Sequence, residues 1–198
     1  MEMQQQQDSF VFKDLFGPKH RYSLCGALVL LGVAYIGEHF ANLYAFEYLA
    51  RPTSTHVGDL LLDNLPTVDL NVIIIEGAFL SIIFGALYVL SKPRSVLFCL
   101  KALALFIIVR ALFISLTHVG IYPNHIDPGP GFFADIYSYL NFQLGFFFSG
   151  HTGLPFLMAL IFWNNRRTRI VLLLMSFVFG TAVLLAHIHY SIDVLAAP

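Results

Sequence analysis

Five long apolar segments constrain what this chain can fold into. They run over Leu24–Phe46, Val68–Leu90, Val96–Thr117, Leu140–Trp163 and Ile170–His187. Because a helix needs about 20 apolar residues to cross a bilayer, each segment predicts one membrane-spanning helix. A sixth apolar segment starts near His189 and is still incomplete at Pro198. We therefore predict an all-α integral membrane protein, a bundle of six transmembrane helices whose sixth helix is incomplete in this chain.

The composition supports this class. Apolar residues make up 58% of the chain and charged residues only 12%, whereas soluble domains carry roughly 25% charged residues. The formal net charge is −1, so we expect the bilayer rather than nucleic acid as a partner. Residues 1–10 are polar and rich in Gln. They lack the apolar stretch and small-residue cleavage site of a signal peptide, so we expect none.

Basic residues occur in alternate connections between the apolar segments. The N-terminal arm, the second connection and the fourth connection carry Lys13, Lys19, Arg21, Lys92, Arg94, Arg166, Arg167 and Arg169. The first and third connections are mainly acidic and carry Asp59, Asp63, Asp69, Asp127 and Asp135. Because basic connections stay in the cytoplasm, we predict that residues 1–23 form a cytoplasmic N-terminal arm. Residues 24–198 then form a single transmembrane domain.

Two histidine motifs fall at the same level of this topology. Ser149-Gly150-His151-Thr152 lies within the fourth segment, and His189-Tyr190-Ser191-Ile192-Asp193 follows the fifth. From the first motif the chain runs roughly 20 Å along a helix to a basic connection, then roughly 28 Å back. We therefore predict that His151 and His189 lie at similar depth, on the non-cytoplasmic side of the membrane.

His189 and Asp193 have the spacing of a nucleophile and its orienting carboxylate. On a helix, residues four apart share a face. A carboxylate that binds one imidazole nitrogen leaves the other free to attack phosphorus and stabilises the imidazolium that forms. The alternative interpretation is a polar pair that caps the start of the last span.

The first motif has the residue types of a phosphate site. Gly150 lets the backbone approach a phosphate closely, and the helix that follows presents N–H groups to an anion. Ser149 or Thr152 can donate to a phosphate oxygen or cap the helix. His151 can protonate a leaving oxygen and later act as a general base. The alternative is a helix start that carries a surface histidine.

Arg110 is a charged residue inside the third span, where a charge is costly and therefore indicates function. Its guanidinium suits phosphate oxygens, and the alternative is an ion pair with Glu76 in the neighbouring span. Glu38, late in the first span, can line the site, but a structural role near the interface is the simpler interpretation. His187 and His189, two residues apart, fall on different helical faces, so we expect no metal site that combines them with Asp193.

These residues resemble a known family. The two histidine motifs are similar to those of the sphingomyelin synthase-like branch of the type 2 phosphatidate phosphatase (PAP2) superfamily, with weaker similarity over Asp59–Pro66 and Arg110–Pro123. The resemblance implies a core of six helices and an outward-facing or lumenal site. It also implies a covalent phosphohistidine intermediate, with no metal or other cofactor.

On this resemblance, His189 is the nucleophile, Asp193 its orienting partner and His151 the general acid and base. A phospholipid donates its phosphocholine or phosphoethanolamine head group to the hydroxyl of a ceramide-like lipid, and diacylglycerol leaves. The phosphatase branch has Pro where this chain has Phe148, and Ser-Arg where it has Ala182 and Val183. These departures favour the synthase-like branch and leave Arg110 as the main cation for the phosphate.

Three functions remain open from the sequence alone. The first is a lipid phosphotransferase, in which a phospholipid donates its head group and a lipid hydroxyl accepts it. The second is a lipid phosphatase or phospholipase C-like hydrolase that uses the same residues with water as the acceptor. The third is a non-catalytic membrane transporter or scaffold. The sequence indicates no oligomeric state.

Overall fold

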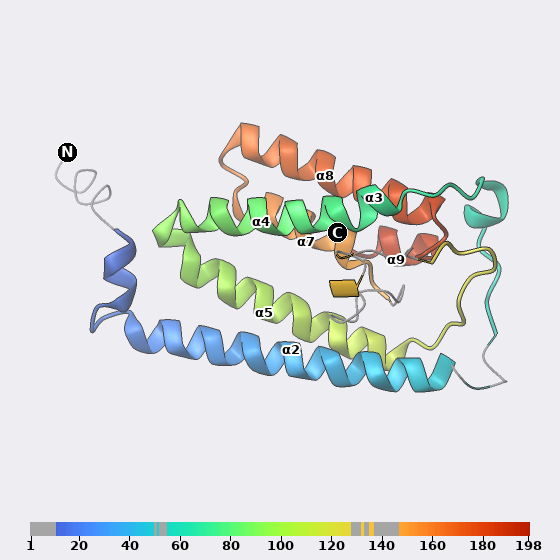
Figure 1. The fold of residues 1–198 in the computed structure, drawn as a ribbon. Helices are drawn as coiled ribbons and strands as arrows, with labels where there is room; N and C mark the ends of the chain where they lie inside the picture. The colour runs from blue at the N-terminus through green and yellow to red at the C-terminus, as the bar shows by residue number, and fades with distance from the viewer. Residues whose placement is uncertain (1–10, 50, 52–54, 128–131, 133–134, 137–146) are drawn as a thin grey trace.

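The computed structural model is a bundle of helices, and every regular element in the part of the chain that it describes is helical (Figure 1). It describes residues 11–49, 51, 55–127, 132, 135–136 and 147–198. The elements are η1 (Phe12–Phe16), α2 (Arg21–Leu49), η2 (Leu62–Asn64), α3 (Asn71–Ile74), α4 (Glu76–Leu90), α5 (Pro93–Leu116), α7 (Gly150–Ile161), α8 (Arg166–Leu185) and α9 (Ser191–Leu195).

Four helical stretches in the described ranges are long and apolar enough to cross a membrane: Arg21–Leu49, Asn71–Leu90, Pro93–Leu116 and Arg166–Leu185. They lie close to four of the spans that the hydropathy pattern predicts, which supports a multi-pass membrane protein whose described elements are all helical. The total of six spans and the cytoplasmic position of the N-terminus remain predictions.

The fourth predicted span differs from the structure. Residues 140–146 of Leu140–Trp163 lie outside the described residues, and residues 147–149 are not helical. Helix α7 begins only at Gly150, after the N-cap residue Ser149, and has 12 residues. The sixth predicted span is represented by the five residues of α9. The second span is interrupted at Ile75, which separates α3 from α4.

The helices pack as two pairs that α4 bridges. α2 lies along α5, and α7 lies along α8 (Figure 1). Small residues allow the close approach of α2 to α5, where Ala41 and Ala45 pack on Ile114. α4 contacts both pairs but buries none of its side chains. Many large apolar residues on the outer faces of the spans are exposed, as expected of surfaces that face lipid.

The two ends of the bundle differ in chemistry. One end holds the short α4–α5 and α7–α8 connections, where Pro93 occupies the first turn of α5 and Asn165 caps α8 by accepting the Thr168 N–H at 3.2 Å. The other end, which we call the outer end, holds the longer connections from α2 to α3, from α5 onward, and from α8 to α9 (Figure 1). Both histidine motifs lie toward the outer end.

Candidate active site

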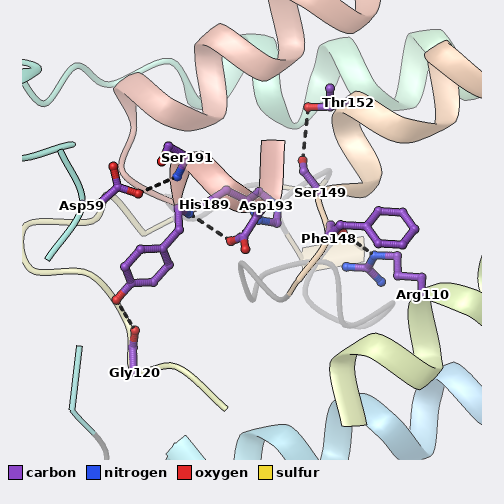
Figure 2. A network of polar contacts seen from close by, with 10 residues as sticks. Asp59, Arg110, Gly120, Phe148, Ser149, Thr152, His189, Ser191 and Asp193 are labelled. Carbon is purple, nitrogen blue, oxygen red and sulfur yellow. Dashed lines mark hydrogen bonds and ion pairs between the residues drawn. The ribbon is translucent and has the colours of Figure 1, made fainter. Parts of the chain in front are cut away.

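His189 lies in the short connection between α8 and α9, not on a helix with Asp193 as the spacing predicts. Asp193 is in the first turn of α9, whose N-cap residue is Tyr190. One carboxylate oxygen of Asp193, Oδ2, accepts the Tyr190 N–H at 2.9 Å and lies 3.3 Å from Nδ1 of His189 (Figure 2). The same oxygen therefore caps α9 and contacts the imidazole, so the capping and orienting interpretations describe one arrangement.

His151 and His189 lie side by side, as the topology predicts. His151 is in the first turn of α7, and its ring centroid lies 6.2 Å from that of His189, with the planes at 70°. A main-chain contact joins the two motifs, because the Ser149 N–H donates to the backbone carbonyl of Asp193 at 2.9 Å. His189 is 3% exposed and Asp193 4% exposed, so the pair is shielded from solvent.

Arg110 projects from α5 toward the start of α7. Its Nε donates to the backbone carbonyl of Phe148 at 2.9 Å (Figure 2). Its Nη1 forms an ion pair with Glu38 on α2, so Arg110 does pair with a carboxylate, but not with Glu76, the example that the alternative interpretation named. Glu76 has a buried carboxylate oxygen, Oε2, without a hydrogen-bond partner in the described part of the chain. Glu38 also lines the cavity, so the structure agrees with the less favoured of its two interpretations from the sequence, a carboxylate within a span that faces the site.

A cavity of about 270 Å³ brings these groups together. Its polar lining includes Glu38, Arg110, Gly150, His151 and His189, and most of its remaining wall is apolar, from α4, α5, α7 and α8. A Cβ added at Gly150 would lie 3.7 Å from Nε of Arg110, so the glycine keeps the space beside the guanidinium open.

Two residues predicted to bind phosphate are not among those that line the cavity. Ser149 is fully buried, and its hydroxyl lies 3.4 Å from that of Thr152. The backbone carbonyl of Thr152 accepts a hydrogen bond from Ser176 on α8 at 2.8 Å. In this structure both residues therefore serve the start of α7 and its packing on α8.

A second cavity of about 300 Å³ adjoins the first one. The two share Ser81, Ile82, Leu103, Leu154 and Pro155. The wall of the second cavity is almost entirely apolar and reaches Leu90, Val96 and Ile161, near the end of the bundle opposite the outer connections. Apolar space thus extends from the two imidazoles along much of α4 and α7.

The outer connections pack over the segment that carries His189. Tyr190 donates from its hydroxyl to the backbone carbonyl of Gly120 at 2.7 Å, and Thr67 contacts Nδ1 of His187 at 3.3 Å. Tyr122 packs its ring on His187 and donates to the Asp63 carboxylate. That hydrogen bond is the main reason that the pKa of Tyr122 rises from 10.0 to about 12.

The described ranges contain no group of three or more His, Cys, Asp or Glu residues arranged to hold a metal ion. His187 contacts Thr67, whereas His189 contacts Asp193, so the His-x-His sequence does not direct both rings to one point.

Comparison with known proteins adds one finding. Residues 146–198, which contain both histidine motifs, match the family model described as PAP2 superfamily C-terminal. No curated protein matches the chain. Members of this superfamily are generally phosphatases or phosphotransferases. The match supports membership of the superfamily and a membrane activity of phosphatase or phosphotransferase type.

Proposed function

We propose that this protein is a membrane-embedded lipid phosphotransferase of the sphingomyelin synthase-like type. It moves a phospho-head group from a phospholipid to a ceramide-like or other lipid hydroxyl through a phosphohistidine intermediate. The observation that carries the proposal is the pair of imidazoles of His151 and His189, whose ring centroids lie 6.2 Å apart at one cavity. The Asp193 carboxylate contacts the ring of His189. The active site faces the non-cytoplasmic side, on the positive-inside argument.

In the first step, His189 acts as the nucleophile. Its Nε2 lone pair forms a bond to phosphorus, and the bond from phosphorus to the glycerol oxygen of the donor breaks. His151, protonated, gives its proton to that oxygen, so diacylglycerol leaves as an alcohol. Asp193 accepts a hydrogen bond from Nδ1–H of His189 and stabilises the positive charge that the ring acquires.

In the second step, His151 gains a new proton from the acceptor lipid. The neutral imidazole takes the proton of the acceptor hydroxyl, whose oxygen then attacks phosphorus. The phosphorus–nitrogen bond breaks, and its electron pair restores neutral His189. His151 ends protonated, ready for the next donor, so the cycle consumes and releases no net proton.

The charge of the cavity favours a phosphodiester over a phosphomonoester. Within the described part of the chain, Arg110 is the one Lys or Arg that lines the cavity, and Glu38 offsets its charge. A phosphodiester carries one negative charge fewer than a fully ionised phosphomonoester, so it meets less repulsion from Glu38. The space between Arg110, Gly150 and the two imidazoles is where we place the phosphate.

The apolar walls fit a lipid donor and a lipid acceptor. The second cavity adjoins the first at Leu103 and Leu154 and is apolar over most of its length. Burying acyl carbons there stabilises the complex by about 0.8 kcal/mol per methylene relative to water. Relative to bilayer lipid the gain is much smaller, so the cavity serves mainly to align the lipid with His189.

The test is head-group transfer by the purified protein in mixed phospholipids with a fluorescent ceramide, with products identified by mass. We expect His189→Ala and Asp193→Asn to abolish transfer while the protein still inserts and folds. The matched control is His125→Ala, because His125 lies in an outer connection and contacts Asp127 rather than the cavity. Full activity in both site variants would overturn the mechanism.

The same assay separates the other functions. A new phospholipid as product means transfer, whereas free phosphate or a free phosphoalcohol means hydrolysis with water as the acceptor. If exposure to labelled donor lipid leaves no label on His189 and no product forms with any donor, the non-catalytic interpretation stands instead.

A further inference from the structure

The position of His189 depends on contacts from distant parts of the chain. The residue lies outside α8 and α9, and its backbone N–H makes only a long hydrogen bond, 3.4 Å, to the Val183 carbonyl of α8. His187, two residues before His189, has a positive φ of 55° and is buried. The helix that follows has only five residues and orients Asp193. Because such a short helix is marginal by itself, contacts with other parts of the chain help to fix where the reactive pair sits.

Asp59 makes the contact that reaches this helix from the connection between α2 and α3. Its Oδ2 accepts the backbone N–H of Ser191, the first residue of α9, at 2.7 Å (Figure 2). Its Oδ1 accepts the N–H groups of Leu61 and Leu62 at 3.0 and 3.2 Å. Asp59 is 6% exposed. One buried carboxylate therefore joins the outer connection to the helix that carries Asp193.

The charge state of Asp59 suits this role. Burial alone raises the pKa of a carboxyl group, but here the hydrogen bonds from Ser191, Leu62 and Leu61 outweigh it and lower the pKa of Asp59 below 3.8. The residue is therefore ionised at neutral pH. Charge-assisted hydrogen bonds of this kind are stronger than neutral ones, and the negative charge lies at the N-terminal end of α9, where helix N–H groups point.

We propose that Asp59 is a positioning residue for the reaction. It holds α9 through Ser191, and thereby holds His189 and Asp193 in register with His151. The effect of Asp59 on the reaction rate rests on the proposed function, whereas the placement of α9 by Asp59 is independent of that function. Asp59 also caps the turn at Leu61–Leu62, and a test must separate that local role from the contact with α9.

Ser191 allows that separation. It is the first residue of α9, a position where proline is tolerated. The preceding residue, Tyr190, has φ −66° and ψ 156°, the conformation that a residue before proline prefers. Ser191→Pro therefore deletes the N–H that Asp59 accepts and leaves the turn at Leu61–Leu62 intact. Ser191→Ala is the comparison variant: it keeps the N–H and removes only the hydroxyl, whose hydrogen bond to Asp59 also lowers the pKa of that carboxyl group.

The experiment compares Asp59→Asn, Ser191→Pro and Ser191→Ala with the wild type. We expect kcat for head-group transfer to fall roughly 10- to 100-fold in Asp59→Asn and Ser191→Pro, with KM nearly unchanged, because small misplacement of reacting groups costs rate rather than binding. The double variant should be no slower than the worse single one, since both remove the same contact. Ser191→Ala should lose clearly less activity than Ser191→Pro, because it keeps the main-chain hydrogen bond to Asp59, and all variants should unfold at similar temperatures.

A second readout does not depend on activity. Modification of His189 by diethyl pyrocarbonate, followed by peptide mass mapping, should accelerate several-fold in Asp59→Asn and Ser191→Pro and clearly less in Ser191→Ala. Equal kcat and equal modification rates in Ser191→Pro and Ser191→Ala would overturn the proposal. If the wild type transfers no head group yet the modification pattern appears as expected, the proposed function fails and the positioning of α9 by Asp59 stands.

Discussion

Arg110 on α5 and Glu38 on α2 form an ion pair at the cavity that both imidazoles line. The pair does two things in this site. It ties together the two longest described helices at the level of the reactive groups, and it sets the net charge beside the phosphate position close to zero. Both consequences can be tested separately because stability and turnover respond differently to the loss of each partner.

Replacing one member of this ion pair should cost stability, and replacing both should restore it. Arg110→Gln or Glu38→Gln leaves a buried charge without its partner, which costs on the order of 3 kcal/mol. The double variant has no unpaired charge, so most of that loss should return. Transfer should nevertheless remain at least about 100-fold below wild type in both variants that lack Arg110, because the phosphate has lost its cation. Denaturation in detergent and the transfer assay measure the two effects; a fully active double variant would contradict the phosphate role of Arg110.

His151 should be needed for an alcohol leaving group but not for a good one. In His151→Gln no general acid protonates the glycerol oxygen, so we expect transfer from a phospholipid to fall about 10²- to 10⁴-fold. A donor with a nitrophenolate leaving group needs no proton, so the variant should still show a burst of nitrophenolate equal to the enzyme present. The absence of that burst, with His189 intact and the protein folded, would argue against His151 as the acid.

Gly120 should not tolerate a side chain. An added Cβ would lie 2.6 Å from the carbonyl carbon of Thr55 and 2.8 Å from the backbone nitrogen of His56, so the backbone must move. We expect Gly120→Ala to cost about 1–3 kcal/mol of unfolding free energy. It should also lower kcat, because Tyr190 donates to the Gly120 carbonyl. Gly26→Ala is the control, since nothing lies within 4 Å of its added Cβ; equal stability of the two variants would refute the expected clash.

Tyr122 should titrate late, and Asp63 should be the reason. The hydrogen bond to Asp63 raises the pKa of Tyr122 from 10.0 to about 12. Because the folded protein favours the protonated phenol, this contribution to stability is complete below pH 10.0 and is lost as the pH rises through about 12. The difference in tyrosinate absorbance between wild type and Tyr122→Phe should show the late midpoint. Asp63→Asn should move it back toward 10.0, whereas Asp69→Asn should not.

The positions of the long helices could be predicted from hydropathy because a helix surrounded by lipid is most stable with apolar side chains on all its faces. Val96–Thr117 and Pro93–Leu116 differ by only a few residues, as do Ile170–His187 and Arg166–Leu185. The prediction was wrong at Phe147 and Phe148, which are apolar but not helical. Apolarity does not specify backbone conformation, and the helix instead starts beyond Ser149 at Gly150.

Only part of the site could be predicted, because the membrane topology determines how deep a residue lies in the bilayer but not which helices contact each other. Alternating basic connections were enough to place His151 and His189 at one level, and the structure brings them together. Hydropathy does not say which spans touch, so the sequence could name Glu76 only as one possible partner of Arg110, whereas the structure pairs Arg110 with Glu38. The hydrogen bond from Ser191 to Asp59 joins α9 to a connection 132 residues earlier in the chain, which no local pattern encodes.

The hydrogen bond from the Ser149 N–H to the backbone carbonyl of Asp193 uses no side chain. The distance between the two motifs is therefore maintained by main chain, whatever the reactive side chains are. It follows that assembly of the site and its chemistry are separable. A protein with both His151 and His189 replaced by Ala should still form the cavity and retain the donor lipid without turning it over, which would make it a substrate trap for identifying the natural lipid.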